Sequence, residues 1–282
     1  MILVVGSTGY LGGEICRRLA AQGKAVRGLV RATSNPERIA ALRAAGVETV
    51  LGDLRQPVTL AEACRGVSTV ISTATTTVSM QAGDSIPLTD HQGQLNLVQA
   101  AQAAGVKQFI YISYSKTIEP GANPCPLTVA KRTVESAVVE SGMTYTILRP
   151  SYFMEMWLSP ATGFDYPNSK ANIFGDGHAK ISFISLGDVA QFAVESVDNP
   201  MTQNAIIELG GPQAVSWLEV VRIFEQAGGK PFDLQFIPAS ALQAQKESAT
   251  DPLQISFAGL MLSAAHDNEV DMRPAAKIFS LG

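Results

Sequence analysis

Short apolar runs rich in β-branched residues alternate with amphipathic, alanine-rich segments from Ile2 to about Arg149. The apolar runs predict six strands, at residues 2–5, 25–30, 48–51, 69–72, 108–112 and 144–148. The segments between them predict five helices, at residues 11–22, 36–45, 58–64, 92–104 and 128–140. This alternation is typical of a parallel sheet covered by helices on both faces, so we expect a doubly wound α/β fold.

Right-handed crossovers place the loop after every strand at the same edge of such a sheet, where ligands bind. Beyond Pro150 the alternation weakens, and residues 153–180 are rich in aromatic, glycine, proline and asparagine residues without a long helical pattern. We therefore expect a sheet domain at residues 1–152 and a smaller C-terminal substrate lobe at residues 153–282. Residues 181–212 of that lobe are expected to pack back on the sheet domain.

The composition narrows the choice of partner. Hydrophobic residues make up 46% and charged residues 16% of the 282 residues, which is enough apolar material for a large core. With 21 basic against 25 acidic residues, the net charge is −4, and no basic run is present, which argues against direct nucleic-acid binding. A small-molecule substrate is the expected partner.

The remaining composition signals concern compartment and metals. Cysteines are few and scattered, and the histidines lie in separate regions without other ligands at metal-site spacing, so we expect neither disulfides nor a metal. The chain starts in an apolar run without a charged signal-peptide region, and its longest apolar stretch, at residues 252–265, is too short to span a bilayer. We expect a cytoplasmic protein with no membrane contact.

The strongest motif is the glycine run from Gly6 to Gly13, GSTGYLGG, placed between the first strand and the first helix. Glycine leaves room for a pyrophosphate at the helix N-terminus, where free N–H groups and the positive end of the helix dipole stabilise the anion. In this strand–turn–helix context the run predicts a dinucleotide-binding Rossmann domain. A turn used only for packing helix against strand is the alternative.

Two charged residues follow the next strands. Arg31 stands after the second strand, where an NAD-selective site usually has an acidic residue, and its guanidinium would pair with the 2′-phosphate of NADP. Lys24 and Arg27 could add to the positive field there, although an arginine after a strand can also be an ordinary surface residue. Asp53, followed by Leu54, could accept from the adenine amino group or cap a short turn.

Several segments together resemble a known family. They are VVGSTGYLGG, VRGLVR, LGDL, LNLVQAAQAAGVKQFIYIS, SGMTYTILRPSYFMEMW, ISFISLGDVAQF and ELGGP, and they cover roughly the first 215 residues. The chain is similar to the NmrA-like group of atypical short-chain dehydrogenases/reductases, which is itself similar to isoflavone-reductase-like enzymes and NAD(P)H:quinone reductases. The resemblance implies an NADP-binding Rossmann protein with a small C-terminal lobe. Some members reduce small molecules, whereas others sense the cofactor or regulate transcription through a protein partner.

The chain departs from the wider superfamily at the YxxxK pair, where the tyrosine donates a proton. The equivalent segment runs from Leu127 to Lys131, so leucine replaces the tyrosine and the lysine is retained on the first turn of the expected helix. Isoflavone-reductase-like enzymes also keep this lysine without the tyrosine. A partly desolvated Lys131 could contact the cofactor and deliver a proton, or it could be an ordinary surface lysine.

The loops after the later strands supply further candidates. Hydroxyls near Thr73 follow the fourth strand, Ser113 and Tyr114 follow the fifth, and an aromatic pair at Tyr152 and Phe153 follows the sixth. We predict Lys131 and Tyr152 as catalytic residues. The predicted cofactor-binding residues are Gly6, Ser7, Thr8, Gly9, Tyr10, Leu11, Gly12, Arg31, Asp53, Leu54, Thr73, Ala74, Thr75, Ser113, Lys131, Pro150, Ser151 and Phe153.

These residues lead to two functional hypotheses. The first is an NADPH-dependent reductase that transfers hydride to a small conjugated carbonyl or quinone, acceptors for which a missing tyrosine is tolerable. The second is a non-catalytic NADP(H)-binding sensor or regulatory protein of the NmrA type, with a protein partner. A sugar-nucleotide epimerase is disfavoured because those enzymes use the tyrosine as a base.

Overall fold

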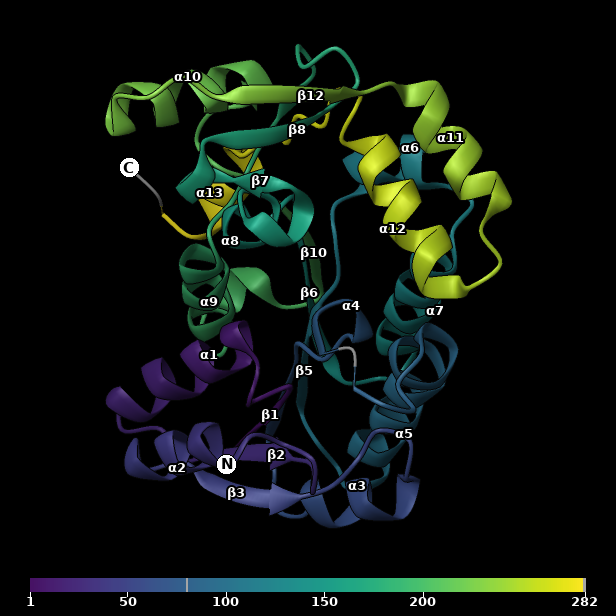
Figure 1. Cartoon of the computed structure of the whole chain (residues 1–282). Helices are drawn as coiled ribbons and strands as arrows, with labels where there is room; N and C mark the ends of the chain where they lie inside the picture. Colours follow the sequence, from purple (N-terminus) through teal and green to yellow (C-terminus); the bar gives the residue numbers. More distant parts are fainter. Residues whose placement is uncertain (80, 281–282) are drawn as a thin grey trace.

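The computed structural model describes residues 1–79 and 81–280, and a seven-stranded parallel sheet runs through this part of the chain (Figure 1). Its strands are, in spatial order, β10 (Ala205–Leu209), β6 (Thr144–Pro150), β5 (Gln108–Ile112), β4 (Thr69–Ser72), β1 (Ile2–Val5), β2 (Val26–Val30) and β3 (Glu48–Leu51). The order reverses between β1 and β4, which creates the switch point where doubly wound sheets bind ligands. The predicted doubly wound sheet is confirmed, and β10 is added at its edge.

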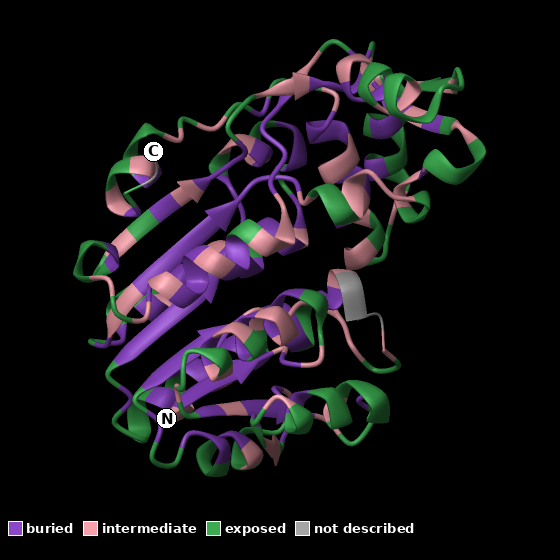
Figure 2. Ribbon diagram, turned by 90° about the vertical axis from the view of Figure 1, so that its left-hand side faces the viewer, coloured by how far each residue is buried: buried purple, intermediate pink, exposed green. Residues whose placement is uncertain are grey.

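Two layers of helices cover the sheet. One face carries α1 (Tyr10–Ala21), α2 (Pro36–Ala44) and α9 (Leu186–Glu195), and the other carries α3 (Pro57–Ala63), α5 (Gln94–Ala103) and α7 (Pro126–Glu140) (Figure 1). Alternation along β1 produces both cores, because Ile2 and Val4 pack with the first layer and Leu3 and Val5 with the second. Figure 2 shows the central strands buried and the helices exposed on their outer faces.

The predicted helix around Lys131 starts earlier than expected. α7 begins at Pro126, because proline fits the first position of a helix and Cys125 before it is extended. Lys131 therefore lies in the second turn of α7, not in the first as the sequence suggested. The π-helix η1 (Ile86–Gly93), which continues into α5, packs against α7.

The C-terminal lobe sits above the sheet edge (Figure 1). It contains a small sheet of β7 (Phe164–Asp165), β8 (Lys170–Phe174) and β12 (Asp233–Ile237), together with α10 (Trp217–Gly228), α11 (Ala239–Ser248) and α12 (Pro252–Ser263). Trp217 is fully buried in its core, and Ser216 and Glu219 form the capping box at the start of α10. Residues 186–209, by contrast, supply α9 and β10 to the sheet layers.

Short elements complete the described chain: α4 (Thr76–Ser79), η2 (Lys116–Ile118), α6 (Glu119–Ala122), α8 (Met154–Trp157), η3 (Pro160–Thr162), η4 (Tyr166–Asn168), β9 (Lys180–Ile181), η5 (Pro200–Thr202), β11 (Val215–Ser216) and α13 (Arg273–Ile278). Over residues 1–79 and 81–280, no helix combines the length and apolarity that crossing a bilayer requires.

Candidate functional site

A cavity of about 560 Å³ follows the C-terminal edge of the sheet. It extends from the turn after β1, past the ends of β2 to β6, to residues of α12 in the C-terminal lobe. Tyr152 and every predicted cofactor-binding residue except Ser7 line it. Ser7 is buried, and its Oγ donates to the carbonyl oxygen of Leu29 at 2.7 Å, which ties the turn to β2.

The glycine turn at one end has no room for side chains. Gly6 has a φ of +86°, and a Cβ atom there would lie 2.5 Å from Thr73 Oγ1. A Cβ atom at Gly12 would lie 2.3 Å from the carbonyl oxygen of Gly6. Helix α1 then begins after Gly9 without a side-chain cap or an acidic residue in its first turn. The bare turn and the uncapped helix fit a diphosphate bound to main-chain amides.

Arg31 and Arg38 make this end of the cavity positive. The Nη1 of Arg31 donates to both carboxylate oxygens of Asp84 at 2.9 and 2.8 Å, and its backbone N donates to Ser34 Oγ at 2.9 Å. Arg38 donates to the carbonyl oxygen of Thr8 at 2.8 Å. Two guanidinium groups and a serine hydroxyl are groups that bind a phosphate monoester.

Sequence reasoning missed Arg38 and Ser34. Ser34 lies in the loop before α2 and Arg38 in the first turn of α2, so the signal was their nearness to Arg31 in the sequence, and surface arginines are common at such positions. The proposed supporting cations Lys24 and Arg27 do not line the cavity, because they pair with Asp198 at 2.5 Å and Glu48 at 2.7 Å.

Asp53 follows β3, the strand next to β2 at the edge of the sheet, and is held by a neighbour. Arg55 donates to both of its carboxylate oxygens, and this hydrogen bonding keeps the pKa of Asp53 below its ordinary value despite partial burial. Asp53 lines the cavity as a fixed acceptor, and its Oδ1 also accepts from the backbone N of Arg55. The structure shows the turn-capping role that the sequence left open, and the role of Asp53 as an acceptor for the adenine amino group stays a prediction.

Lys131 reaches the cavity from α7 and is almost completely buried, at 5% exposure. Its Nζ donates to the carbonyl oxygen of Ile112 at 3.2 Å and lies 5.0 Å from the ring centroid of Tyr111. Burial lowers the pKa of Lys131 below its ordinary value, and the charges of Asp90 and Glu135 oppose part of this lowering. The alternative of an ordinary surface lysine is therefore wrong.

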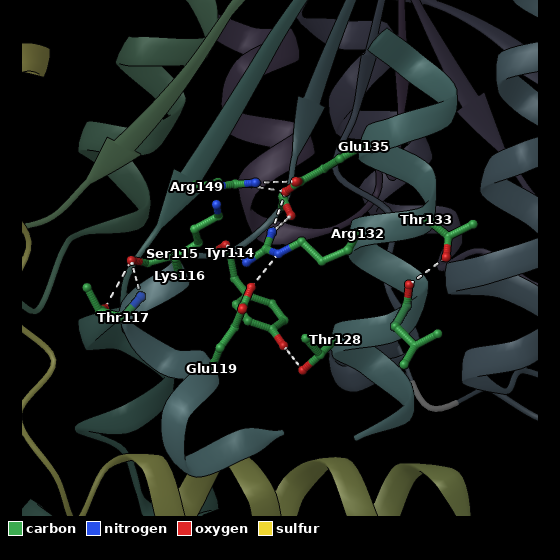
Figure 3. Close-up of polar contacts among 12 residues, drawn as sticks. Tyr114, Ser115, Lys116, Thr117, Glu119, Thr128, Arg132, Thr133, Glu135 and Arg149 are labelled. Carbon is green, nitrogen blue, oxygen red and sulfur yellow. Dashed lines mark hydrogen bonds and ion pairs between the residues drawn. The ribbon is translucent and has the colours of Figure 1, made fainter. Parts of the chain in front are cut away.

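An ion network of Arg132, Glu135 and Arg149 joins α7 to the ends of β5 and β6 (Figure 3). Glu135 accepts from Arg149 and Arg132, and Arg132 also donates to Ser113 Oγ at 3.1 Å and to the carbonyl oxygen of Tyr114 at 2.9 Å. Burial raises the pKa of Glu135, but hydrogen bonds and charges from its neighbours outweigh this and hold the pKa below its ordinary value. The network fixes the backbone from which Ser113 and Lys131 project.

The hydroxyl groups of two tyrosines that line the cavity, Tyr114 and Tyr152, are already engaged. The Tyr114 hydroxyl is hydrogen-bonded to Thr128 (Figure 3). The Tyr152 hydroxyl donates to the carbonyl oxygen of Leu260 on α12 at 3.2 Å, and burial raises its pKa. Tyr152 therefore presents its ring to the cavity. Leu127 lines the cavity at the position where the YxxxK motif has its tyrosine.

The walls at this end are apolar and come from distant parts of the chain. Tyr152 and Trp157 meet edge to face, with ring centroids 4.7 Å apart, and Phe257 and Leu260 of α12 close the opposite side. Sequence reasoning missed the two α12 residues because most of the C-terminal lobe lies between β6 and α12 along the chain. Among the described lining residues, Lys131 is the charged group at this end.

Comparisons with known proteins agree on a family. The model of the NmrA-like family matches residues 1–269. An NAD(P)H azoreductase from Xenophilus azovorans is 33% identical over 251 residues, 87% of this chain and 79% of the relative. Phenylcoumaran benzylic ether reductase IRL1 from Ginkgo biloba is 31% identical over 280 residues, 94% of this chain and 85% of the relative. The photosystem II assembly factor Ycf39 from Synechocystis sp. is 28% identical, covering 99% of this chain and 85% of the relative.

Solved structures show the same fold. The NADPH-dependent quinone oxidoreductase QOR2 from Escherichia coli, complexed with NADPH, matches with a TM-score of 0.77 at 22% identity, covering 99% of this chain and 95% of that one. The triphenylmethane reductase from Citrobacter sp., complexed with NADP(H), matches with a TM-score of 0.76 at 22% identity, covering 99% and 95%.

Proposed function

Because the chain belongs to the NmrA-like family, as its sequence segments suggested, we propose that it is an NADPH-dependent reductase that transfers hydride to a small conjugated carbonyl or quinone. The observation that carries the proposal is the cavity itself. It joins a bare diphosphate turn with phosphate-binding arginines at one end to a buried lysine between apolar walls at the other. The reductases among the relatives and neighbours, two of them complexed with NADPH or NADP(H), support the same reading.

Residues along the cavity would bind successive parts of the cofactor. The main-chain amides after Gly9 would hold the diphosphate, and Arg31, Ser34 and Arg38 the 2′-phosphate. Bound NADPH supplies the hydride. Pro150, Ser151 and Phe153, at the end of β6, line the cavity between the glycine turn and the apolar walls, and would hold the reduced ring against the acceptor.

Lys131 supplies the electrophilic group. When hydride reaches a conjugated acceptor, negative charge develops on the acceptor oxygen, and the Lys131 ammonium would stabilise it and then donate a proton to it. Tyr152 contributes its ring as a flat wall, with Trp157 beside it. The apolar walls favour an uncharged, planar acceptor over a carboxylic acid.

A sensor function remains the second candidate, and Leu127 favours it, since no tyrosine is present at the YxxxK position to donate a proton. A relative named as an assembly factor shows that proteins of this similarity carry names other than reductase. In that case NADP(H) would bind in the same way and a protein partner would read the bound state. A cytoplasmic location also stays a prediction.

The deciding experiment follows NADPH oxidation by absorbance with a panel of quinones and enones. Turnover on at least one acceptor that requires the protein supports the reductase. Tight NADPH binding by calorimetry without turnover on any acceptor supports the sensor. Failure of both NADPH and NADH to bind overturns the proposal as a whole.

A further inference from the structure

Three buried side-chain atoms within the described residues have no hydrogen-bond partner: Asp90 Oδ1, the Tyr111 hydroxyl and Ser151 Oγ. Ser151 belongs to the cavity wall, although its Oγ is buried. Asp90 and Tyr111 are fully buried and do not line the cavity. An unpartnered polar atom in such a place destabilises the fold unless another group or a buried water satisfies it.

Asp90 is held firmly by its other oxygen. Oδ2 accepts from the backbone N of Thr76 at 3.0 Å and from the Thr76 hydroxyl at 2.5 Å. Asp90 lies on η1, which packs against α7, the helix that carries Lys131. Its free Oδ1 thus belongs to a carboxylate that is anchored in the layer behind the reactive end of the cavity.

The Lys131 ammonium group has N–H donors that make no hydrogen bond to the described protein atoms. Its Nζ donates to the Ile112 carbonyl oxygen and lies over the Tyr111 ring, and no second protein acceptor contacts it within residues 1–79 and 81–280. An ammonium group has more than one N–H to donate. The layer therefore holds an anchored carboxylate with an unused oxygen, a tyrosine with an unused hydroxyl and a buried cation with unused donors.

We propose that Asp90 is a positioning residue for Lys131, and that its free carboxylate oxygen, with the Tyr111 hydroxyl, keeps the Lys131 side chain an ammonium at the cavity through a buried water. The inference rests on the proposed function, in which that ammonium acts on the acceptor. In the reaction, an N–H bond of Lys131 breaks and an O–H bond of the reduced acceptor forms. The neutral amine then recovers its proton from solvent after the product leaves.

Charged groups around Lys131 support this assignment to Asp90. The other titratable groups on α7 and the elements packed about Lys131 are Asp90 and His91 on η1, Tyr111 on β5, Arg132, Glu135 and Glu140 on α7, and Tyr145 and Arg149 on β6. Glu135 is already shared between Arg132 and Arg149. The sequences of α5 and α12, which also contact α7, contain no titratable residue. Among the described carboxylates on these elements, Asp90 is therefore the buried one without an ion pair, whereas Glu140 is exposed.

The test measures protonation of Lys131 directly. Trace labelling with acetic anhydride at a series of pH values, read by peptide mass spectrometry, gives the midpoint at which Lys131 becomes a neutral, reactive amine. Asp90→Asn keeps an acceptor for Thr76 and removes the charge, so the midpoint should fall by at least about one pH unit, a tenfold change in the amine-to-ammonium ratio. Asp188→Asn, an exposed carboxylate outside the cavity, should leave the midpoint unchanged.

Asp90→Asn should also change the pH dependence of the reaction. The alkaline limb of the kcat/KM profile should shift to lower pH by the same amount in Asp90→Asn, because Lys131 acts in its protonated form. A labelling midpoint within about 0.3 units of wild type overturns the inference even if the protein turns over quinones. If the labelling midpoint of Lys131 shifts in Asp90→Asn but the protein reduces no acceptor, the inference about Asp90 is supported and the proposed reaction is overturned.

A thermodynamic cycle keeps the inference testable if Asp90→Asn folds poorly. Lys131→Met leaves the Asp90 charge buried alone, so melting of the single and double variants reports their coupling. The double variant should melt no lower than the less stable single variant. Additive losses in melting temperature would overturn the coupling.

Discussion

The two ends of the cavity are built in different ways. The end that we propose for the diphosphate is a continuous stretch, Gly6 to Gly12, in which every residue except Ser7 lines the cavity. The reactive end brings together Lys131, Tyr152 and Leu260 from separate parts of the chain, where Lys131 donates to the carbonyl oxygen of Ile112 and Tyr152 to that of Leu260. We expect changes at the first end to alter cofactor affinity, and changes at the second to alter the rate.

Gly12→Ala gives the largest expected effect. The added Cβ would lie 2.3 Å from the Gly6 carbonyl oxygen, and neither backbone can yield without closing the turn. NADPH affinity by calorimetry should fall by about 1,000-fold, ~4 kcal/mol.

Gly13→Ala is the matched control within the same turn. Its Cβ would lie 3.3 Å from the Ser7 carbonyl oxygen, a contact that a small shift relieves, so the loss should stay below about fivefold. Folding of both variants is checked by circular dichroism. Normal NADPH binding by a folded Gly12→Ala protein would show that the diphosphate lies elsewhere.

Lys131→Met tests the other end. Removing the ammonium group should lower kcat/KM for a quinone by about 100-fold, because proton donation and charge stabilisation are lost together. NADPH affinity should change by less than about threefold. The exposed Lys107→Met is the control and should keep full activity. A large loss of NADPH affinity with an unchanged kcat would erase the contrast between the two ends.

Arg31→Ala addresses which cofactor the first end selects. A charge-assisted hydrogen bond to a phosphate is worth about 2 kcal/mol, so NADPH affinity should fall by about 30-fold and NADH affinity by less than about threefold. The Arg43→Ala protein loses an arginine that lies outside the cavity and should bind both as before. Equal losses for NADPH and NADH would remove Arg31 from 2′-phosphate binding, leaving it a role in holding Asp84.

Substitutions of Tyr152 should have the smallest effect on kcat/KM, and two of them distinguish the contribution of the ring from that of the hydroxyl. Its hydroxyl donates to the Leu260 carbonyl oxygen, so Tyr152→Phe should change kcat/KM by less than about threefold, whereas Tyr152→Ala, which removes the wall, should lower it by about tenfold. Melting temperatures of both variants control for the lost packing. A large defect in Tyr152→Phe would assign the hydroxyl a direct catalytic role.

Local sequence patterns were enough to predict much of the fold and one end of the cavity. The alternation in β1, the glycine turn and the Ser216–Glu219 capping box each depend on residues close in sequence, so they could be predicted without the structure. Lys131 could be identified from the sequence because it stands at the lysine position of the YxxxK motif. Its burial could not be predicted, because burial depends on how η1 and β5 pack against α7.

Residues that sequence reasoning missed share one property. Arg38, Asp84, Asp90 and the α12 wall contribute through contacts with partners that are distant in the chain, such as Thr8 for Arg38 and Arg31 for Asp84. Their residue types are common on surfaces or in cores, so neither composition nor spacing distinguishes them.

The sequence by itself determined the doubly wound sheet and the diphosphate turn, because periodicity and glycine act over a few neighbouring residues. Only the tertiary structure decided that Lys131 is buried and which apolar side chains close the reactive end. Desolvation depends on distances through space, which are set by the packing of η1 and β5 against α7 and of α12 over the cavity.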